Sequence, residues 1–362
     1  MFSYDYLIVG SGLTGATMAR LLHDRGERVL VVEKRPHPGG NVWDEVHPSG
    51  IRFHTYGPHY FRTSDARIWA FAQRFSEFYT YVPCLKSWVD GAYENWPIAA
   101  SYIQRTVGAD WQPAFRGTPG NFEEAALGLM PEEVYYKFVR GYNKKQWGVD
   151  PRSLSASLIR RFDVRADDDP RLMPNKRFQG LPIHGYARWM ENMLQGIPLL
   201  LNTDYLAHRK EFKPRKRTIY TGPIDAFFDY RFGKLAYRGQ QRSVEYLPDV
   251  DTFQVVGQVN NPVPEAGPHI RTIEWKHLLP PAVAVRIRGT LLTREIPITP
   301  ADPDQYEYPF PDAANAALYA RYRALADEHP EVLVAGRLGE YQYYDMDQAI
   351  GRAMMLVAKV LG

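Results

Sequence analysis

The chain has 362 residues, a length that allows two or three domains around a sizeable core. Its 44 basic and 41 acidic residues leave a formal net charge of +3, which is too balanced to indicate nucleic-acid binding. Because Cys84 is the one cysteine, an intrachain disulfide is excluded and a reducing compartment fits. The sequence begins as a strand rather than a signal peptide and has no apolar run of membrane-spanning length, so we expect a cytoplasmic protein without membrane insertion.

The first strong pattern is a strand, turn, helix and second strand at the N-terminus. An apolar strand at 4–9 runs into GSGLTG at 10–15, a helix continues to Gly26, and a second strand at 28–32 ends on Glu33. This order is that of a dinucleotide-binding unit, in which a pyrophosphate lies on the free N–H groups at the start of the helix.

Each glycine of this motif has a separate physical role. Gly10 permits the tight turn, Gly12 lets the backbone approach a pyrophosphate, and Gly15 lets the helix pack close to the strand. Glu33 is placed to accept a hydrogen bond from a ribose hydroxyl. The motif starts near the N-terminus, and the glycine pair in RPHPGGN at 35–41 resembles that of flavoproteins of the glutathione-reductase type, so we predict FAD rather than NAD.

The next part of the chain alternates between aromatic turns and helical patterns. We predict, in order, a turn at Gly57-Pro58, a helix at 65–78, a hairpin that turns at Asp90-Gly91, and mostly helical structure over 97–148. Within 97–148, Asn121 is expected to cap one helix, and Pro131 is expected at the first position of another. The stretch 153–182 holds many charges beside two prolines, which predicts a mobile surface loop. It is either a solvated linker or a lid that closes on an anionic substrate.

The remaining pattern returns to strands and ends in helices. We predict helices at 186–194, 313–328 and 346–360, and strands at 199–201, 218–220, 240–259, 271–279, 291–299 and 331–335. We therefore expect a discontinuous FAD-binding domain over 1–64, 199–238 and 312–362. A helical domain with the start of the mobile loop covers 65–165, and the loop with an antiparallel sheet covers 166–198 and 239–311.

Seven motifs in order along the chain resemble those of the UDP-galactopyranose mutase family. They are GSGLTG, HTYGPH, GYNKKQW at 141–147, FQGLP at 178–182, TGPID at 221–225, TIEWKH at 272–277 and GRLGEYQYYDM at 336–346. The resemblance implies an α/β fold with a Rossmann-like FAD-binding domain, an inserted helical domain and a twisted antiparallel β-sheet domain. It also implies an isomerase that interconverts UDP-galactopyranose and UDP-galactofuranose, or a modified relative, for cell-surface polysaccharide biosynthesis.

The family's mechanism requires reduced FAD, with NADPH or a similar reductant, although no net redox change occurs. Its implied route passes through a covalent bond between flavin N5 and C1 of the sugar. By motif position, Arg165 and Arg271 clamp the diphosphate, and His59 lies beside the isoalloxazine ring. Bacterial members are often homodimers, so a homodimer is one expectation here.

The resemblance also assigns the other binding residues. It implies that the uridine is bound by Tyr142 and Trp147, and Phe178 stands where relatives often carry tyrosine. The residues implied on the diphosphate and sugar side are Tyr308, Tyr343 and Asp345. The predicted cofactor contacts are Gly10, Gly12, Leu13, Thr14, Gly15, Glu33, Lys34, Gly40, Asn41, His59, Arg337 and Met346. No metal site is predicted.

Two departures from the family pattern concern the sugar. The mobile loop reads DVRADDD at 163–169, and the aromatic turn ends in FRT, with Arg62 where histidine is commoner. A branch accepting 2-acetamido sugars resembles this chain at that position, so Arg62 is predicted to contact the sugar unless it pairs with a nearby carboxylate such as Asp65. Alternatives are an FAD oxidoreductase of the amine oxidase type, a mutase for another nucleotide sugar such as a dTDP-6-deoxyhexose, and a non-catalytic dinucleotide-binding module.

Overall fold

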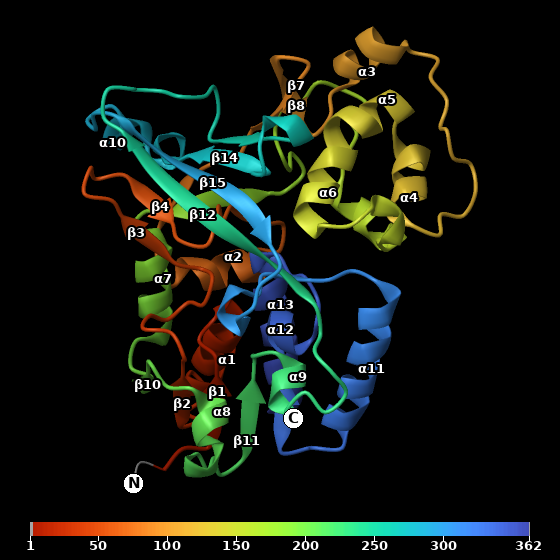
Figure 1. Cartoon of the computed structure of the whole chain (residues 1–362). Coiled ribbons are helices and arrows are strands. Elements are labelled where there is room, and N and C mark those ends of the chain that lie inside the picture. The colour runs from red at the N-terminus through yellow and green to blue at the C-terminus, as the bar shows by residue number, and fades with distance from the viewer. Residues whose placement is uncertain (1–2, 362) are drawn as a thin grey trace.

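A parallel five-stranded sheet occupies the lower half of the molecule in Figure 1, in a computed structural model that describes residues 3–361. Its strand order is β10 (Leu199–Leu200), β2 (Val29–Val32), β1 (Tyr6–Val9), β11 (Arg217–Tyr220) and β17 (Val332–Val334). The strands come from the N-terminal, middle and C-terminal parts of the chain. Neighbouring strands pair in parallel and, apart from Arg217 and Thr218 of β11, through apolar or aromatic residues.

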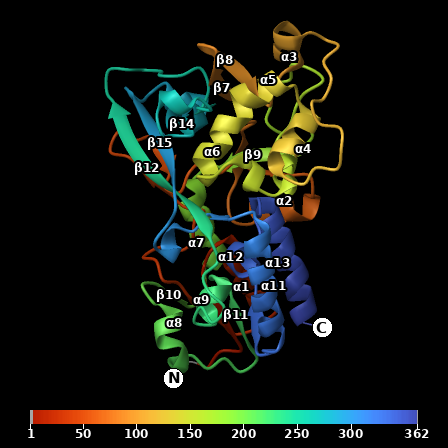
Figure 2. The same ribbon diagram turned by 45° about the vertical axis from the view of Figure 1, so that its right-hand side comes forward.

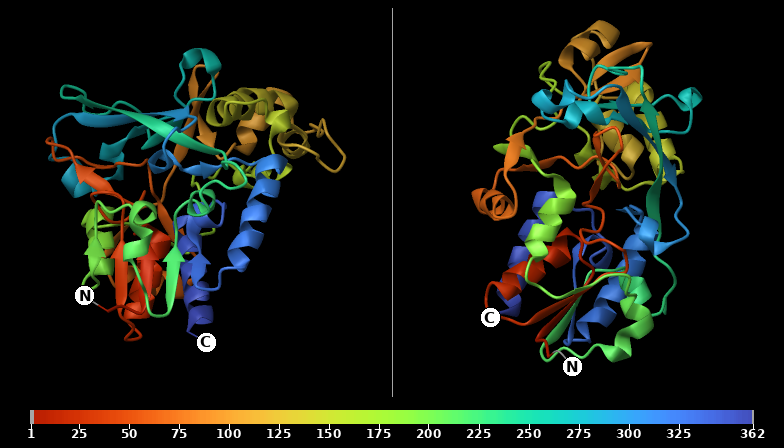
Figure 3. Two further views of the ribbon diagram at one scale, coloured as in Figure 1. Left: turned by 60° about the horizontal axis from the view of Figure 1, so that its bottom comes forward. Right: turned by 90° about the vertical axis from the view of Figure 1, so that its left-hand side faces the viewer.

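Helices cover both faces of this sheet (Figure 3). Within β1, Tyr6 and Ile8 pack into one apolar cluster, whereas Leu7 and Val9 pack into another on the opposite face. The first cluster includes α1 (Leu13–His23), α7 (Gly185–Leu194) and α13 (Met346–Val360). The second includes α8 (Tyr205–His208), α9 (Ile224–Phe227) and α11 (Ala313–Asp327). Burial on both faces explains why β1 and β2 are apolar throughout.

A seven-stranded sheet forms the upper part of the molecule, with the long β12–β15 ribbon crossing it diagonally (Figures 1 and 2). The order is β16 (Tyr308–Pro309), β12 (Tyr237–Leu247), β15 (Thr290–Ile298), β14 (Arg271–Glu274), β13 (Gln258–Asn260), β7 (Leu85–Val89) and β8 (Ala92–Trp96). All neighbours are antiparallel except β13 and β7.

A cluster of short helices lies at one end of this sheet (Figure 2). It contains α3 (Ala100–Val107), α4 (Phe122–Leu129), α5 (Glu132–Val134), a π-helical turn (Tyr135–Arg140) and α6 (Gly141–Trp147). A separate core that includes Phe122, Met130 and Phe138 holds these helices together. Asn121 caps α4 as predicted, since its side chain accepts a hydrogen bond from Glu124 N.

Smaller elements connect these parts. They are α2 (Ala66–Gln73), α10 (Pro281–Ala284), α12 (Gly336–Gly339), the hairpin of β3 (Asp44–Val46) with β4 (Arg52–His54), and a three-stranded sheet of β5 (Phe61–Thr63), β9 (Phe178–Pro182) and β6 (Phe78–Thr80). Short 3₁₀ helices occur at Pro151–Ser153, Ala156–Arg161, Arg209–Glu211, Pro264–Ala266, Trp275–Leu278 and Pro303–Gln305. Among residues 3–361, no helix is long and apolar enough to cross a membrane.

The structure differs from the sequence predictions at several places. The expected helix over 65–78 ends at Gln73, and the strand expected over 271–279 ends at Glu274. Pro131 is the N-cap rather than the first helical residue. The end of the predicted loop is strand β9, which pairs with β5 and β6 on its two sides. The predicted hairpin at Asp90-Gly91 is confirmed, and its strands β7 and β8 join the seven-stranded sheet although they lie within 65–165.

Candidate active site

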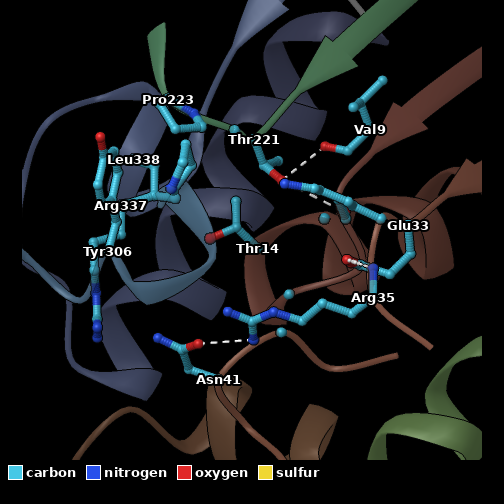
Figure 4. Close-up of a pocket in the computed structure, with 18 of the residues that line it drawn as sticks. Val9, Thr14, Glu33, Arg35, Asn41, Thr221, Pro223, Tyr306, Arg337 and Leu338 are labelled. Carbon is cyan, nitrogen blue, oxygen red and sulfur yellow. Dashed lines mark hydrogen bonds between the residues drawn. The ribbon is translucent and has the colours of Figure 1, made fainter. Parts of the chain in front are cut away.

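A cavity of about 370 Å³ opens where β1, β2 and β11 end. Figure 4 shows side chains of the N-terminal unit on one side of it and residues of 221–223 and 336–338 on the other. Every residue predicted to contact the cofactor lines this cavity, namely Gly10, Gly12, Leu13, Thr14, Gly15, Glu33, Lys34, Gly40, Asn41, His59, Arg337 and Met346. Their contact with a cofactor stays a prediction.

The glycines make this cavity possible. Gly10 has a φ of +93°, and a side chain there would lie 2.2 Å from Thr221 Oγ1. At Gly15 an added carbon would lie 2.0 Å from the Gly10 carbonyl oxygen, which shows how closely α1 approaches β1. At Gly12 the nearest atom would be Gly40 Cα at 4.0 Å, so the protein leaves space over the first N–H groups of α1.

Glu33 is buried at the end of β2. One of its oxygens accepts hydrogen bonds from Ser11 N (2.8 Å) and Ser11 Oγ (2.7 Å), and the other accepts from Arg35 N (2.9 Å). A carboxylate has about four acceptor positions, so one is left for a ribose hydroxyl. The Arg35 guanidinium lies 4.5 Å over the Tyr56 ring and donates to Asn41 Oδ1 (2.9 Å), as Figure 4 shows for Asn41.

The opposite wall comes from distant parts of the chain. Thr221 Oγ1 donates to the Val9 carbonyl (2.8 Å), which joins the end of β11 to the end of β1. Arg337 follows Gly336, whose φ is +80°, and it donates to the carbonyl oxygens of Tyr344 (2.8 Å) and Glu307 (3.2 Å). Arg337 is therefore fixed at the boundary between the cavity and the seven-stranded sheet.

His59 reaches the cavity from the aromatic turn. Its Nδ1 donates to the Gly57 carbonyl (2.7 Å), and its backbone N–H donates to His54 Nδ1 (3.0 Å). Burial lowers the pKa of His59 to about 4, and burial also lowers the pKa of His54 well below its usual range. At neutral pH His59 is therefore an uncharged imidazole that keeps its proton on Nδ1 and presents Nε2 as an acceptor.

The neutral state of His59 predicts an acid-labile fold. Between its folded pKa of about 4 and its usual value of 6.5, the unfolded state binds more protons than the folded state. The free energy of unfolding should therefore fall by up to about 3 kcal/mol as the pH drops through this window. Urea titrations at several pH values measure it, and His59→Gln should show a smaller pH dependence. An equal pH dependence in both proteins would contradict the prediction.

A cluster of cations and aromatic rings adjoins the cavity. Tyr308 and Tyr343 stack with their ring centroids 5.8 Å apart. The guanidinium carbon of Arg161 lies 4.5 Å from the Tyr343 centroid and 5.6 Å from that of Tyr308, and Arg337 lies 4.7 Å from Tyr343. The guanidinium groups of Arg161 and Arg337 thus both lie against the Tyr343 ring. Two neighbouring guanidinium groups offer several N–H donors, which suits an anion with several oxygens.

A polar row crosses the seven-stranded sheet beside this cluster. Paired positions on five neighbouring strands carry Ser87, Asn260, Arg271, Glu295 and Arg242. Glu295 is fully buried and accepts from Nε of both Arg271 and Arg242, the latter at 3.0 Å. Burial opposes ionisation of Glu295, but the two arginines lower its pKa. Arg271 is therefore held charged and in one orientation.

The same network reaches the segment that carries Tyr308. Arg242 donates to both carboxylate oxygens of Glu307 (2.8 and 3.0 Å) and to the Tyr56 carbonyl (2.8 Å). At Gly57 an added side chain would lie 2.3 Å from Glu295 Oε1, so the aromatic turn also contacts the row. The network thus joins the candidate diphosphate residues to the turn that positions His59.

Helix α6 brings two predicted residues to this region. Burial raises the pKa of Tyr142 against the opposing effect of the nearby Arg271. Trp147 is only 4% exposed, and its ring packs edge-on against Tyr308 and Phe310 at centroid distances of 6.5 and 5.7 Å. A ring this buried supports Tyr308, whereas half-buried Tyr142 keeps surface for a ligand.

Arg165 and Phe178 make other contacts. The Arg165 guanidinium donates to the carbonyl oxygens of Arg171 (3.1 Å) and Leu172 (3.2 Å) and lies 3.1 Å from Asp163. These bonds hold it on its own loop. Phe178 stacks on Trp69 of α2 at 5.3 Å. The structure therefore brings Arg271, Tyr142, Tyr308 and Tyr343 together but does not join Arg165 or Phe178 to them.

Arg62 pairs with a different carboxylate from the one considered in the sequence. Its Nη2 donates to Asp345 Oδ2 (3.3 Å), and Tyr343 donates to Asp345 Oδ1 (3.3 Å). Asp65 instead accepts from Arg67 N (2.8 Å) and pairs with the Arg67 guanidinium, so pairing of Arg62 with Asp65 is wrong. Asp65 was the closer residue in sequence, but it is occupied as the N-cap of α2.

Several lining residues were missed by sequence reasoning. Arg161 belonged to a run of charges without helical or strand periodicity, and Arg242 with Glu295 required the sheet register. In the dinucleotide cavity the residues not predicted include Asp204, Thr221, Tyr230 and Tyr306. The TGPID motif was the one available signal, and it pointed to the position of Thr221.

The fold and its cavity define a dinucleotide-binding α/β enzyme with a second, antiparallel sheet domain beside the cofactor cradle. Residues 8–75 match the model of a NAD(P)-binding Rossmann-like domain, and residues 137–343, more than half of the chain, match the model of UDP-galactopyranose mutase. The chain belongs to the UDP-galactopyranose mutase family and is an isomerase of the mutase type.

Individual relatives agree with this assignment. A probable UDP-galactopyranose mutase of Klebsiella pneumoniae is 31% identical, covering 98% of this chain and 94% of the relative. A dTDP-fucopyranose mutase of Escherichia coli is also 31% identical, covering 96% of each chain. A crystal structure of reduced UDP-galactopyranose mutase superimposes with a TM-score of 0.77 at 15% identity, covering 99% of this chain and 96% of that structure.

Proposed function

We propose that this enzyme binds FAD and, with the flavin reduced, interconverts the pyranose and furanose forms of a UDP-sugar. The position of Arg337 carries the proposal. Arg337 lines the dinucleotide cavity and also lies 4.7 Å over Tyr343, so the predicted flavin end and the cationic cluster share one residue. A nucleotide sugar held by that cluster would present its anomeric carbon towards the cavity.

The cavity fits FAD in its shape and donors. The space above Gly12 and the uncapped start of α1 suit a pyrophosphate, and Glu33 keeps an acceptor position for a ribose. Gly39 and Gly12 form a backbone bridge that closes the cradle from the other side. A bound and reduced flavin would supply, at its N5, the nucleophile for C1 of the sugar.

The chain's own residues bind the nucleotide and stabilise the leaving group. Arg271, Arg161 and Arg337 surround the position proposed for the diphosphate, and Tyr142 lies beside it for the uridine. As the bond from C1 to the diphosphate breaks, negative charge grows on the phosphate oxygens. Arg271 stabilises this charge without reorienting, since Glu295 already fixes its guanidinium. Because the nucleotide sugar is only isomerised, the overall reaction involves no net electron transfer.

Product analysis with reduced and oxidised enzyme tests the function. Dithionite-reduced protein should convert UDP-galactopyranose into its furanose form, whereas the oxidised protein should be inactive because the nucleophile is absent. Chromatography resolves the two ring forms, and dTDP-sugars belong in the panel because the Escherichia coli relative is named for one. Equal rates in the two redox states would overturn the proposed role of the flavin, and substrate-dependent flavin reduction would favour an oxidoreductase.

A second candidate substrate, a UDP-2-acetamido sugar such as UDP-N-acetylgalactopyranose, is favoured by Arg62. Its Nε is buried and has no hydrogen-bond partner among residues 3–361, although one Nη donates to Asp345. A free guanidinium donor beside Asp345 and Tyr343 is suited to an amide carbonyl on the sugar.

Replacing Arg62 with histidine should change the choice between the two sugars. Loss of one hydrogen bond should shift the ratio of kcat/KM towards the plain sugar by roughly 1 kcal/mol, or about fivefold. The matched control is Arg67→His, because Arg67 is exposed and pairs with Asp65 at the surface. If the ratio of kcat/KM for the two sugars does not change, the preference between them is determined by the loop 163–172 instead.

Four further expectations stay predictions. They are NADPH as the reductant, a homodimer, a cytoplasmic location and a role in cell-surface polysaccharide synthesis.

A further inference from the structure

Lys145 occupies an unusual place on α6, between Tyr142 and Trp147. Its Nζ donates to three backbone carbonyl oxygens, those of Val263 (2.7 Å), Asn261 (3.1 Å) and His269 (3.1 Å). An ammonium group has three donors, so all of them are used. The three acceptors belong to the segment 261–269, which joins β13 to β14 and leads directly into Arg271.

Two further contacts fix the same helix, one to this segment and one to strand β12. At Gly141 an added side chain would lie 2.1 Å from the Pro262 carbonyl oxygen, so the start of α6 touches the segment directly. At the other end, Arg238 of β12 donates to the carbonyl oxygens of Gln146 (2.8 Å) and Lys145 (3.3 Å). Helix α6 is thus held at its start, middle and end, and Lys145 provides the middle attachment.

We propose that Lys145 is a positioning residue that sets the spacing between Tyr142 on α6 and Arg271 on β14, and hence the affinity for the nucleotide. This inference rests on the proposed function, in which these two residues contact the uridine and the diphosphate. Lys145 acts through the backbone, because its ammonium binds the segment rather than a ligand. Its neighbour Lys144 is exposed and provides a matched comparison.

The charge of this ammonium is sensitive to its surroundings. Glu265 and His269 lie near it on the bound segment, Arg238 of β12 donates to the Lys145 backbone carbonyl, and Arg294 of β15 lies near His269. Burial lowers the pKa of Lys145 to about 8, and burial lowers that of His269 below its usual value, so His269 is uncharged above neutral pH. A neutral amine has only two N–H donors for the three carbonyl oxygens.

Binding of UDP to the FAD holoenzyme tests the proposal. In Lys145→Met the dissociation constant for UDP should rise about tenfold, the scale of one misplaced charge-assisted contact. FAD content should stay that of the wild type, because the dinucleotide cavity does not include Lys145. Lys144→Met should bind UDP as the wild type does. An unchanged dissociation constant in folded Lys145→Met would overturn the proposal.

The wild-type protein provides a second test that needs no stable variant. Its dissociation constant for UDP should rise severalfold as the pH passes through about 8, and Lys144→Met should show the same rise. A constant affinity across this range would overturn the role of the ammonium even where Lys145→Met fails to fold. If the wild-type holoenzyme binds neither UDP nor dTDP at any pH, the proposed function fails, and with it the basis of this inference.

Discussion

The Gly12→Val variant is expected to purify as a folded, colourless protein without FAD. The φ of Gly12 is −57°, which valine adopts without strain, and the nearest atom to a side chain there would be Gly40 Cα at 4.0 Å. The first side-chain carbon of valine therefore meets no close protein atom. The valine fills the space above the start of α1, where the pyrophosphate is proposed to lie, so it should remove FAD while leaving the fold intact.

The ratio of flavin to protein absorbance measures this effect. We expect FAD affinity to fall by up to roughly a hundredfold, because overpacking a tight contact costs about 1–3 kcal/mol. Circular dichroism and thermal unfolding should match those of wild-type protein stripped of FAD. Gly15→Ala is the contrasting control, since its methyl group would lie 2.0 Å from the Gly10 carbonyl oxygen and should destabilise the fold itself. Stoichiometric FAD in Gly12→Val would refute the assignment of the cavity.

Sequence reasoning was most accurate where the determining interactions are local. The final helix was predicted over its observed range, 346–360, because its apolar residues repeat with helical spacing. The Asp90-Gly91 turn was predicted because its residues tolerate positive φ, and both adopt it. The nucleotide unit combined such signals within one short stretch, so its elements were predicted together with the glycines and Glu33 that line the cavity.

The candidate substrate site was less predictable because its contacts join residues far apart in sequence. Arg62 and Asp345 are separated by 283 positions, and no local pattern favoured that partner over Asp65. The row from Ser87 to Arg242 exists only once five strands are paired in register. Strand β9 was predicted as loop because its charged, proline-containing neighbourhood hid the pairing with β5 and β6.

Substitution of Arg271 by alanine is the second change for which we expect a large effect. The proposed role of Arg271 is to stabilise charge on the departing diphosphate, so its loss should cost roughly 3 kcal/mol in kcat/KM, about a hundredfold. FAD content should be unaffected, because Arg271 does not line the dinucleotide cavity. The buried Glu295 would keep Arg242 as its remaining partner, so some loss of thermal stability is also expected.

Two controls separate the role of the guanidinium from that of charge alone. Arg271→Lys keeps a positive charge but loses the planar fork that binds two oxygens together, so it should recover only part of the activity. Arg294→Ala removes a neighbouring arginine of the same sheet that pairs with Glu245 at the surface, and it should remain close to wild type. Near-wild-type turnover in Arg271→Ala would show that the diphosphate binds elsewhere.

Arg165 gives the corresponding test for the loop. Its guanidinium is bound to the carbonyl oxygens of Arg171 and Leu172, so a contact with the diphosphate requires these bonds to break. If the loop closes on the substrate, Arg165→Ala should lose activity on the same scale as Arg271→Ala, roughly 3 kcal/mol in kcat/KM. Arg171→Ala is the matched control, since Arg171 lies on the same loop, is exposed and pairs with Asp169. If Arg165→Ala is as active as Arg171→Ala, Arg165 does not bind the diphosphate, and its role is the structural one that its contacts with Arg171 and Leu172 show.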